Sequence, residues 1–244
     1  MASPDVRPEP HPSTVFSLVP INGRAEAAVT HSLNSHLISV VQLPNNSSKI
    51  GINVGPHIGS SSQNTLATLG RSGADITLEG ATISRIHCSF EVNENFGTIL
   101  LYDRSSTQPT KFFGPDSRPF ERGQIRRVVV TPEMNTLLGI GGDNCELLLF
   151  RLFWHKKDIS LMNVVASRSE NPRHARTLDE TPTAAASRYL TRIHTPGGPL
   201  ASHKYVKLRQ VGAGAFGKVW KAIDTNTGRI MAVKVVKTLG LSTH

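Results

Sequence analysis

The sequence predicts a mainly β protein whose first 155 residues fold as a β-sandwich. Short apolar or alternating runs recur between turn signals, and helical periodicity is missing from this half. With 38% hydrophobic and 18% charged residues, the composition is that of a soluble globular protein. Strands at such spacing are typical of a sandwich. The expected strands are 16–19, 37–41, 88–92, 99–102, 128–130 and 147–154.

Turn clusters separate these strands. Asn, Gly and Ser gather at 45–48, 93–97 and 141–144, and such residues supply positive φ and bond their own backbone at chain reversals. The longer Ser/Asn/Gly-rich segment 44–64 is expected to be a flexible insertion.

Several protein classes are excluded by what the sequence lacks. No run approaches the 18 or more apolar residues of a spanning helix, so no membrane partner is expected. Residues 1–13 are polar and proline-rich, and we expect a disordered N-terminus without a signal peptide. Cys88 and Cys145 fit neither a disulfide framework nor metal-ligand spacing, so no metal is expected. A reducing compartment, the nucleus and/or cytoplasm, is therefore predicted.

The net charge of +9 belongs to the C-terminal part. Residues 156–244 carry 15 basic and 5 acidic side chains, whereas residues 1–155 carry 12 and 13. Between 156 and 204 the cations are scattered among Ser, Thr, Pro and Ala, a composition that cannot offset the entropy of ordering. We interpret 156–204 as a flexible basic linker, with one short helix near 158–165 able to pack on the sandwich. Direct nucleic-acid binding is not expected.

A second β pattern begins at residue 205. Strand-like runs occupy 205–208, 219–223 and 230–236. A unit of 40 residues, 205–244, is too small to be stable alone without metals or disulfides, so we expect an incomplete domain.

Three loop motifs in the first half suggest a phosphate site. They are Gly70-Arg71, Ser84-Arg85-Ile86-His87 and Asp103-Arg104-Ser105-Ser106-Thr107. Phosphate needs charge-assisted donors, which the guanidinium groups of Arg71 and Arg85, the Ser84 hydroxyl and loop amides would supply. The competing interpretation is that Arg71, Arg85 and Asp103 form surface ion pairs.

On these motifs, residues 14–155 resemble a forkhead-associated (FHA) domain, a β-sandwich that binds phosphothreonine peptides. The resemblance implies that Arg71 and Ser84 hold the phosphate, that Arg85 contacts peptide backbone or phosphate, and that His87 braces the loop from behind.

One motif departs from the family pattern. The family follows its Asp-x-Ser-Ser/Thr run with Asn-Gly-Thr, whose Asn holds the peptide main chain, but Thr107-Gln108-Pro109-Thr110 stands here. Thr107 or Gln108 would have to make that contact.

A glycine-rich motif occurs near the C-terminus. Val211 to Val219 reads VGAGAFGKV, followed by Met231-Ala232-Val233-Lys234. Strand-like sequence on both sides is incompatible with a dinucleotide fold, which needs a helix after the glycines. A Walker loop would have Ser or Thr where Val219 follows Lys218.

This arrangement resembles the start of a eukaryotic-type protein kinase domain, so 205–244 is interpreted as a truncated kinase N-lobe. The resemblance implies that the glycines cover the ATP phosphates, that valine and alanine flank the adenine, and that the lysine binds the α- and β-phosphates of ATP with Mg²⁺. The implied ATP-binding residues are Val211, Gly212, Gly214, Gly217, Val219, Ala232 and Lys234.

The order FHA domain, linker and kinase domain resembles the checkpoint and meiotic FHA-containing Ser/Thr kinases, as in fungi. The resemblance implies recognition of threonine-phosphorylated proteins coupled to ATP-dependent protein phosphorylation, in DNA-damage checkpoint or meiotic signalling. No catalytic loop or magnesium-binding Asp precedes His244, so the 244-residue chain is itself expected to be inactive and contributes no catalytic residue.

Two alternatives belong to other classes. One is a non-catalytic phosphothreonine-binding adaptor with a vestigial kinase segment, and the other is an all-β interaction module without phosphate selectivity. Linker residues Thr181 and Thr195, each followed by Pro, also allow self-association if their phosphorylated forms dock in the sandwich of a second chain.

Overall fold

The computed structural model describes residues 9–60, 62–118, 120, 125–142, 146–155, 160–169, 205–225 and 227–236. The first elements are β1 (Phe16–Pro20), α1 (Gly23–Val29), the 3₁₀ helix η1 (Ser32–Leu37), β2 (Ile38–Gln42), β3 (Ser48–Val54), β4 (Thr65–Gly70) and β5 (Ile76–Thr77). The next are β6 (Cys88–Val92), β7 (Ile99–Asp103), β8 (Lys111–Phe113), β9 (Arg127–Val130), β10 (Leu137–Ile140) and β11 (Leu148–Trp154). The last are α2 (Leu161–Ser169), β12 (Tyr205–Gly214), β13 (Gly217–Asp224) and β14 (Ile230–Val236).

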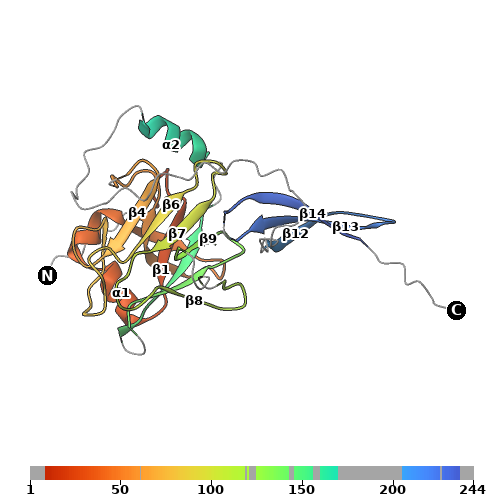
Figure 1. Cartoon of the computed structure of the whole chain (residues 1–244). Coiled ribbons are helices and arrows are strands. Elements are labelled where there is room, and N and C mark those ends of the chain that lie inside the picture. Colours follow the sequence, from red (N-terminus) through yellow and green to blue (C-terminus); the bar gives the residue numbers. More distant parts are fainter. Residues whose placement is uncertain are drawn as a thin grey trace.

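Two sheets form the predicted sandwich (Figure 1). One has the strand order β2-β3-β1-β11-β10-β8 and the other β5-β4-β6-β7-β9, with β4 and β5 forming a parallel pair. The sheets meet through apolar side chains that are excluded from water, and the rings of Phe16 on β1 and Phe90 on β6 pack edge to face at 4.9 Å. The mainly β prediction for this half is confirmed.

Each of the six strands predicted in this half is present, but the flexible insertion predicted at 44–64 is wrong. That segment contains β3, which lies between β1 and β2 in the six-stranded sheet. The alternating apolar residues Ile50, Ile52 and Val54 give β3 its buried face, while Gly51 fits against the Leu18 carbonyl, where a Cβ would come within 3.3 Å. Glycine and serine content concealed this alternation.

The absence of helix predicted for the first half is also wrong. Helix α1 begins after Asn22, whose side chain accepts a hydrogen bond from the Ala25 amide, and it buries Ala25, Ala28 and Val29. Seven residues are too few to show helical periodicity, and the buried alanines carry little hydrophobic signal.

The 3₁₀ helix η1 is tied to the five-stranded sheet by Asn34, which is fully buried. Its side-chain amide donates to the Thr77 carbonyl at 2.8 Å and its carbonyl oxygen accepts from the Thr77 amide at 2.9 Å. Asn34 therefore pairs with β5 as a neighbouring strand would, and it fixes η1 beside the end of β4.

Helix α2 lies in the segment assigned to the linker and packs on the sandwich, as expected for 158–165. Val165 is buried in the core, and the Arg168 guanidinium donates to the carbonyls of Gln63, Thr65, Pro56 and Ile58. The linker residues 156–159 and 170–204 lie outside the described residues. No helix in the described ranges is long and apolar enough to cross a membrane.

Strands β12, β13 and β14 form a separate antiparallel sheet in the predicted order of strand, glycine turn, strand, turn and strand. One end of this sheet packs on the outer face of the five-stranded sheet, where Ile223 contacts a cluster containing Leu100, Val129 and Met134. Asn93 also donates to the Thr227 carbonyl at 2.8 Å. The glycine turn lies at the opposite end, pointing away from the sandwich (Figure 1).

Candidate functional site

The candidate site is formed where the loop after β4 lies against the loop that carries Arg85. Strand β4 ends at Gly70, where a Cβ would overlap the Arg85 carbonyl oxygen and come within 2.9 Å of the Ile86 Cα. Only glycine lets the two backbones lie this close without displacement.

Backbone hydrogen bonds then join the two arginine-bearing loops. The Arg71 amide donates to the Ser84 carbonyl at 3.0 Å, and the Ser72 amide donates to the Arg85 carbonyl at 3.3 Å. Arg71 and Ser84, which are 13 positions apart in the sequence, are thus held side by side at one end of the sandwich.

The two arginine side chains are exposed at this end. Among the described residues, the Arg71 guanidinium makes no hydrogen bond or ion pair, and Asp103 is paired with Arg126 at 2.9 Å. Of the competing ion-pair interpretation, Asp103 does form an ion pair, but with Arg126, and Arg71 forms none among the described residues. Arg71 therefore presents an uncompensated guanidinium to solvent, as an anion site requires.

His87 supports the Ser84 loop from inside the protein. Its ring is fully buried, and Nδ1 accepts a hydrogen bond from the Ser84 amide at 3.2 Å. Burial, opposed by the Asp103 carboxylate and assisted by Arg126, lowers the pKa of His87 below its usual value. The lowered pKa favours the neutral imidazole at neutral pH, and because Nδ1 accepts the Ser84 amide, the ring proton is assigned to Nε2. This arrangement fits the bracing role that the resemblance implied.

The third loop is organised around Asp103, whose carboxylate is buried. It accepts hydrogen bonds from the Ser105 hydroxyl at 3.1 Å and from the Thr110 amide and hydroxyl at 3.2 and 3.0 Å. Arg126 neutralises the carboxylate and also donates to the Ser105 carbonyl. The sequence alone did not point to Arg126, because the Arg126-Arg127 pair at the start of β9 belongs to no recognised motif.

This loop reaches the other two through Ser84. The Ser84 hydroxyl oxygen accepts from the Ser106 amide at 3.1 Å and lies 3.3 Å from the Ser106 hydroxyl. Thr107 is exposed and Gln108 is half-buried in the residues that follow. All five predicted phosphopeptide residues, Arg71, Ser84, Arg85, Thr107 and Gln108, thus lie on three loops that meet at one end of the sandwich.

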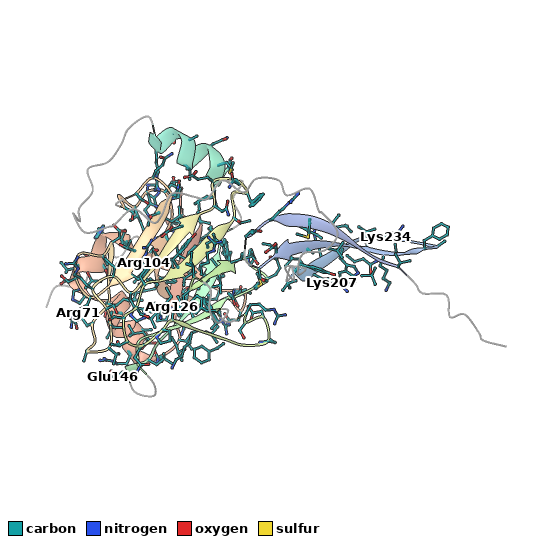
Figure 2. All side chains as sticks on the ribbon, in the orientation of Figure 1. Arg71, Arg104, Arg126, Glu146, Lys207 and Lys234 are labelled. Atoms are coloured by element: carbon teal, nitrogen blue, oxygen red, sulfur yellow. The ribbon has the colours of Figure 1, made fainter. Side chains whose placement is uncertain are left out.

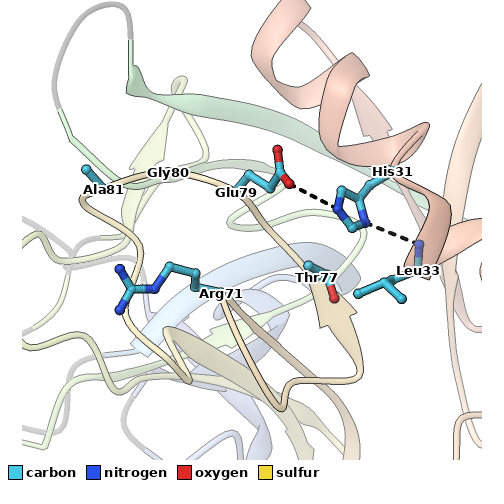
Figure 3. A pocket seen from close by; sticks show the side chains of 7 residues that line it. All are labelled: His31, Leu33, Arg71, Thr77, Glu79, Gly80 and Ala81. Atoms are coloured by element: carbon cyan, nitrogen blue, oxygen red, sulfur yellow. Dashed lines mark hydrogen bonds and ion pairs between the residues drawn. The ribbon is translucent and has the colours of Figure 1, made fainter.

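A surface pocket opens beside Arg71 (Figure 3). His31 Nδ1 accepts from the Leu33 amide at 3.2 Å, and Nε2 therefore carries the proton and donates to Glu79 at 3.1 Å. The pocket is lined by His31, Leu33, Arg71, Thr77, Glu79, Gly80 and Ala81. Its η1 wall was not foreseen, because the segment 32–37 has no pattern that predicts where it packs.

The fold and loops define a class: a β-sandwich that presents an arginine and a hydroxyl at converging loop ends. Comparison with protein families places an FHA domain at residues 67–125, a span that contains all three motifs. An FHA domain implies recognition of phosphothreonine peptides. No curated protein matches the chain well enough to be counted as a relative.

The predicted ATP-binding residues lie on β12, β13 and β14. The register pairs Gly212 with Val219, Val219 with Lys234, and Lys221 with Ala232. Because directly paired residues of antiparallel strands point to the same side, Val219, Ala232 and Lys234 share one sheet face. Val211 lies at a β-bulge and is 52% exposed.

The glycine turn has two differently constrained glycines. Gly217 has φ +146° and its Cβ would overlap the Val235 carbonyl, so the fold itself requires glycine there. At Gly214 a Cβ would meet nothing within 4 Å, so packing does not explain this glycine.

Lys234 lies near that turn, with Nζ 6.0 Å from the centre of the exposed Phe216 ring. The lysine and the glycine turn therefore lie at the same end of the three-stranded sheet. Lys234 and Arg71 lie at opposite ends of the molecule (Figure 2).

Proposed function

We propose that this protein is a phosphothreonine reader in which Arg71 and Ser84 hold the phosphate group. The observation that carries the proposal is the convergence of the two residues: their backbones are hydrogen-bonded, and the Arg71 guanidinium has no partner among the described residues. Hydrogen bonds to charged groups contribute about 1.5–3 kcal/mol each, so two or three of them support selective binding of modest affinity.

The remaining predicted residues have supporting roles in this proposal. Arg85 contacts the phosphate or the peptide backbone, and Thr107 or Gln108 binds the peptide main chain where the family uses Asn. His87 and Asp103 are positioning residues, because they hold the Ser84 loop and the 104–110 loop from inside the protein.

Fluorescence anisotropy of matched peptides tests the proposal. A library of phosphothreonine peptides, with unmodified threonine and phosphoserine counterparts, is titrated with the full 244-residue chain. We expect binding only with phosphate, and tighter binding of phosphothreonine than phosphoserine. Equal binding of phosphorylated and unmodified peptides would instead favour the interaction module without phosphate selectivity.

We further propose that the reader belongs to a Ser/Thr protein kinase that uses ATP with Mg²⁺ in DNA-damage checkpoint or meiotic signalling, in the nucleus and/or cytoplasm. The resemblance at the glycine turn motivates this proposal, and the common sheet face of Val219, Ala232 and Lys234 supports it. When bound, Mg²⁺ would neutralise charge on the ATP phosphates. Lys234 would supply the cation on the α/β-phosphates, and Gly214 would admit them without a Cβ clash.

Sequencing of the transcript beyond the His244 codon tests the kinase proposal. A reading frame that continues into a His-Arg-Asp loop and an Asp-Phe-Gly motif would support it. A stop codon there would favour the phosphothreonine-binding adaptor with a vestigial kinase segment.

Self-association through the linker is a separate proposal from the sequence, since Thr181 and Thr195 lie outside the described residues. Sedimentation velocity of the chain carrying phosphothreonine at either position tests it. We expect a dimer that an excess of free phosphothreonine peptide dissociates, and a monomer at all concentrations would contradict the idea.

A further inference from the structure

We propose that the pocket beside Arg71 binds a lysine or arginine side chain that flanks the phosphothreonine in the peptide. The inference rests on the proposed phosphate site and adds a sequence preference to it. The residues that would set this preference are His31, Leu33 and Glu79 (Figure 3).

Hydrogen bonds between η1, α1 and β5 hold the pocket wall in place. The buried Asn34 pairs with both backbone groups of Thr77 and also donates to the Ala28 carbonyl at 2.8 Å, so η1 is fixed to β5 and α1. His31 caps η1, because its Nδ1 accepts a hydrogen bond from the Leu33 amide. These bonds hold Leu33 in the pocket wall with 63% of its surface exposed, which leaves apolar area uncovered at the site.

Glu79 supplies an oriented negative charge. Glu79 Oε1 accepts a hydrogen bond from His31 Nε2, with 3.1 Å between the two atoms, and this bond limits the rotation of the carboxylate. The Glu79 side chain is nevertheless 75% exposed. Among the described residues Oε2 has no hydrogen-bond donor. Lysine and arginine match this combination because their aliphatic stems cover apolar surface while their charged ends remain at the rim.

Two nearby guanidinium groups make the preference conditional on phosphate. Arg71 lines the pocket, and Nη2 of Arg24 lies 3.7 Å from where a Cβ of Gly80 would be. Both repel a basic ligand side chain, and a phosphate bound at Arg71 would remove the repulsion from Arg71. We therefore expect a basic residue to strengthen binding of the phosphorylated peptide and not of its unmodified counterpart.

Anisotropy titrations of the full chain test the inference. Each phosphothreonine peptide carries Lys, Arg, Ala or Glu at one of the three positions on either side of the phosphothreonine. At one position we expect Lys and Arg to bind about two- to fivefold tighter than Ala, the range of an exposed ion pair. Unmodified versions of the same peptides should show no such difference.

Substitutions at Glu79 assign the preference to the pocket. Glu79→Gln should abolish it, and Glu79→Lys should reverse it in favour of Glu. Glu133→Gln is the matched control, because Glu133 is an exposed carboxylate in the turn between β9 and β10. This variant should keep the wild-type preference.

The outcomes separate this inference from the proposed function. If the Ala-flanked phosphopeptide binds but no position prefers Lys or Arg, or if the preference survives Glu79→Lys, the pocket assignment is wrong and the phosphate site stands. A preference for Glu in the wild type would show that Arg24 and Arg71 dominate the pocket and would overturn the inference. If the wild type binds no phosphopeptide, both proposals fail.

Discussion

Gly70 has no room for a side chain because the Arg85 carbonyl lies against its α-carbon. We expect Gly70→Ala to lower the free energy of unfolding by about 1–3 kcal/mol, as overpacking does, and to weaken phosphopeptide binding by separating Arg71 from Ser84. Urea unfolding and anisotropy measure the two effects. Gly23→Ala is the control, since a Cβ there meets nothing within 4 Å. Equal stability of the two variants would contradict the close approach.

His87 predicts a pH dependence of stability. Burial lowers its pKa in the folded protein, so below about pH 6.5 the unfolded state binds more protons than the folded state. His87 therefore destabilises the fold as the pH falls from 6.5 toward its folded pKa, and it has no such effect above 6.5. Protonation of Nδ1 would also break the bond to the Ser84 amide.

Urea midpoints measured between pH 7.5 and 5 check this effect. We expect the wild-type midpoint to fall more steeply than that of His87→Asn, whose side-chain oxygen can still accept the Ser84 amide. Parallel curves for the two proteins would show that His87 does not carry the dependence.

The residues of the site were predictable only where they form motifs. Arg71, Ser84 and His87 stand in recognisable patterns, whereas Arg126, His31 and Glu79 act through contacts between loops distant in the sequence. No spacing rule identifies which arginine neutralises a buried aspartate 23 positions earlier in the sequence.

At the scale of elements, Arg168 attaches α2 to the sandwich. Its guanidinium donates to four backbone carbonyls from two segments, which no other residue type can satisfy in the same geometry. We expect Arg168→Ala to weaken α2 docking by about 1–3 kcal/mol and to accelerate amide exchange in residues 161–169. Arg168→Lys should give an intermediate rate of amide exchange. If the exchange rate of residues 161–169 is unchanged in both variants, Arg168 does not hold α2 on the sandwich.

Elements were predictable where periodicity is long or turns are explicit. Strands β6 and β7 with their Asn/Gly turn follow the expected pattern, whereas β3 was hidden by Gly51 and Asn53 at its second face. Helix α1 is short and alanine-rich, so its existence depends on a cap and on packing that the sequence pattern does not display.

At the scale of the whole molecule, the C-terminal sheet is joined to the sandwich through Ile223. This side chain is 1% exposed and packs against Leu100, Val129 and Met134. Burial of one such side chain contributes about 1.5–3 kcal/mol, so Ile223→Asp should increase amide exchange in 205–236 about tenfold or more. Val235→Asp, at a site 40% exposed, should leave the contact intact. Equal amide-exchange rates in the two variants would contradict a stabilising contact at Ile223.

The two β units were predictable from the runs of strand-like sequence in 16–154 and 205–236, but the contact between them was not. Leu100 on β7 and Val129 on β9 lie on the face opposite the sandwich core. The apolar sequence of these strands shows that both of their faces are buried, but not what covers the outer one. Which segment covers the outer face of these strands depends on tertiary packing, and the sequence pattern does not show it.

The most direct test of the phosphate site is phosphothreonine-peptide affinity in Arg71→Ala and Ser84→Ala chains, with Arg151→Ala and Ser48→Ala as controls. Arg151 is exposed on β11 and Ser48 is exposed at the β2–β3 turn, so both controls remove the same groups elsewhere. We predict a loss of about tenfold or more in each site variant, the loss expected for one hydrogen bond to a charged group, and no loss in the controls. Binding that survives both site substitutions would contradict the account.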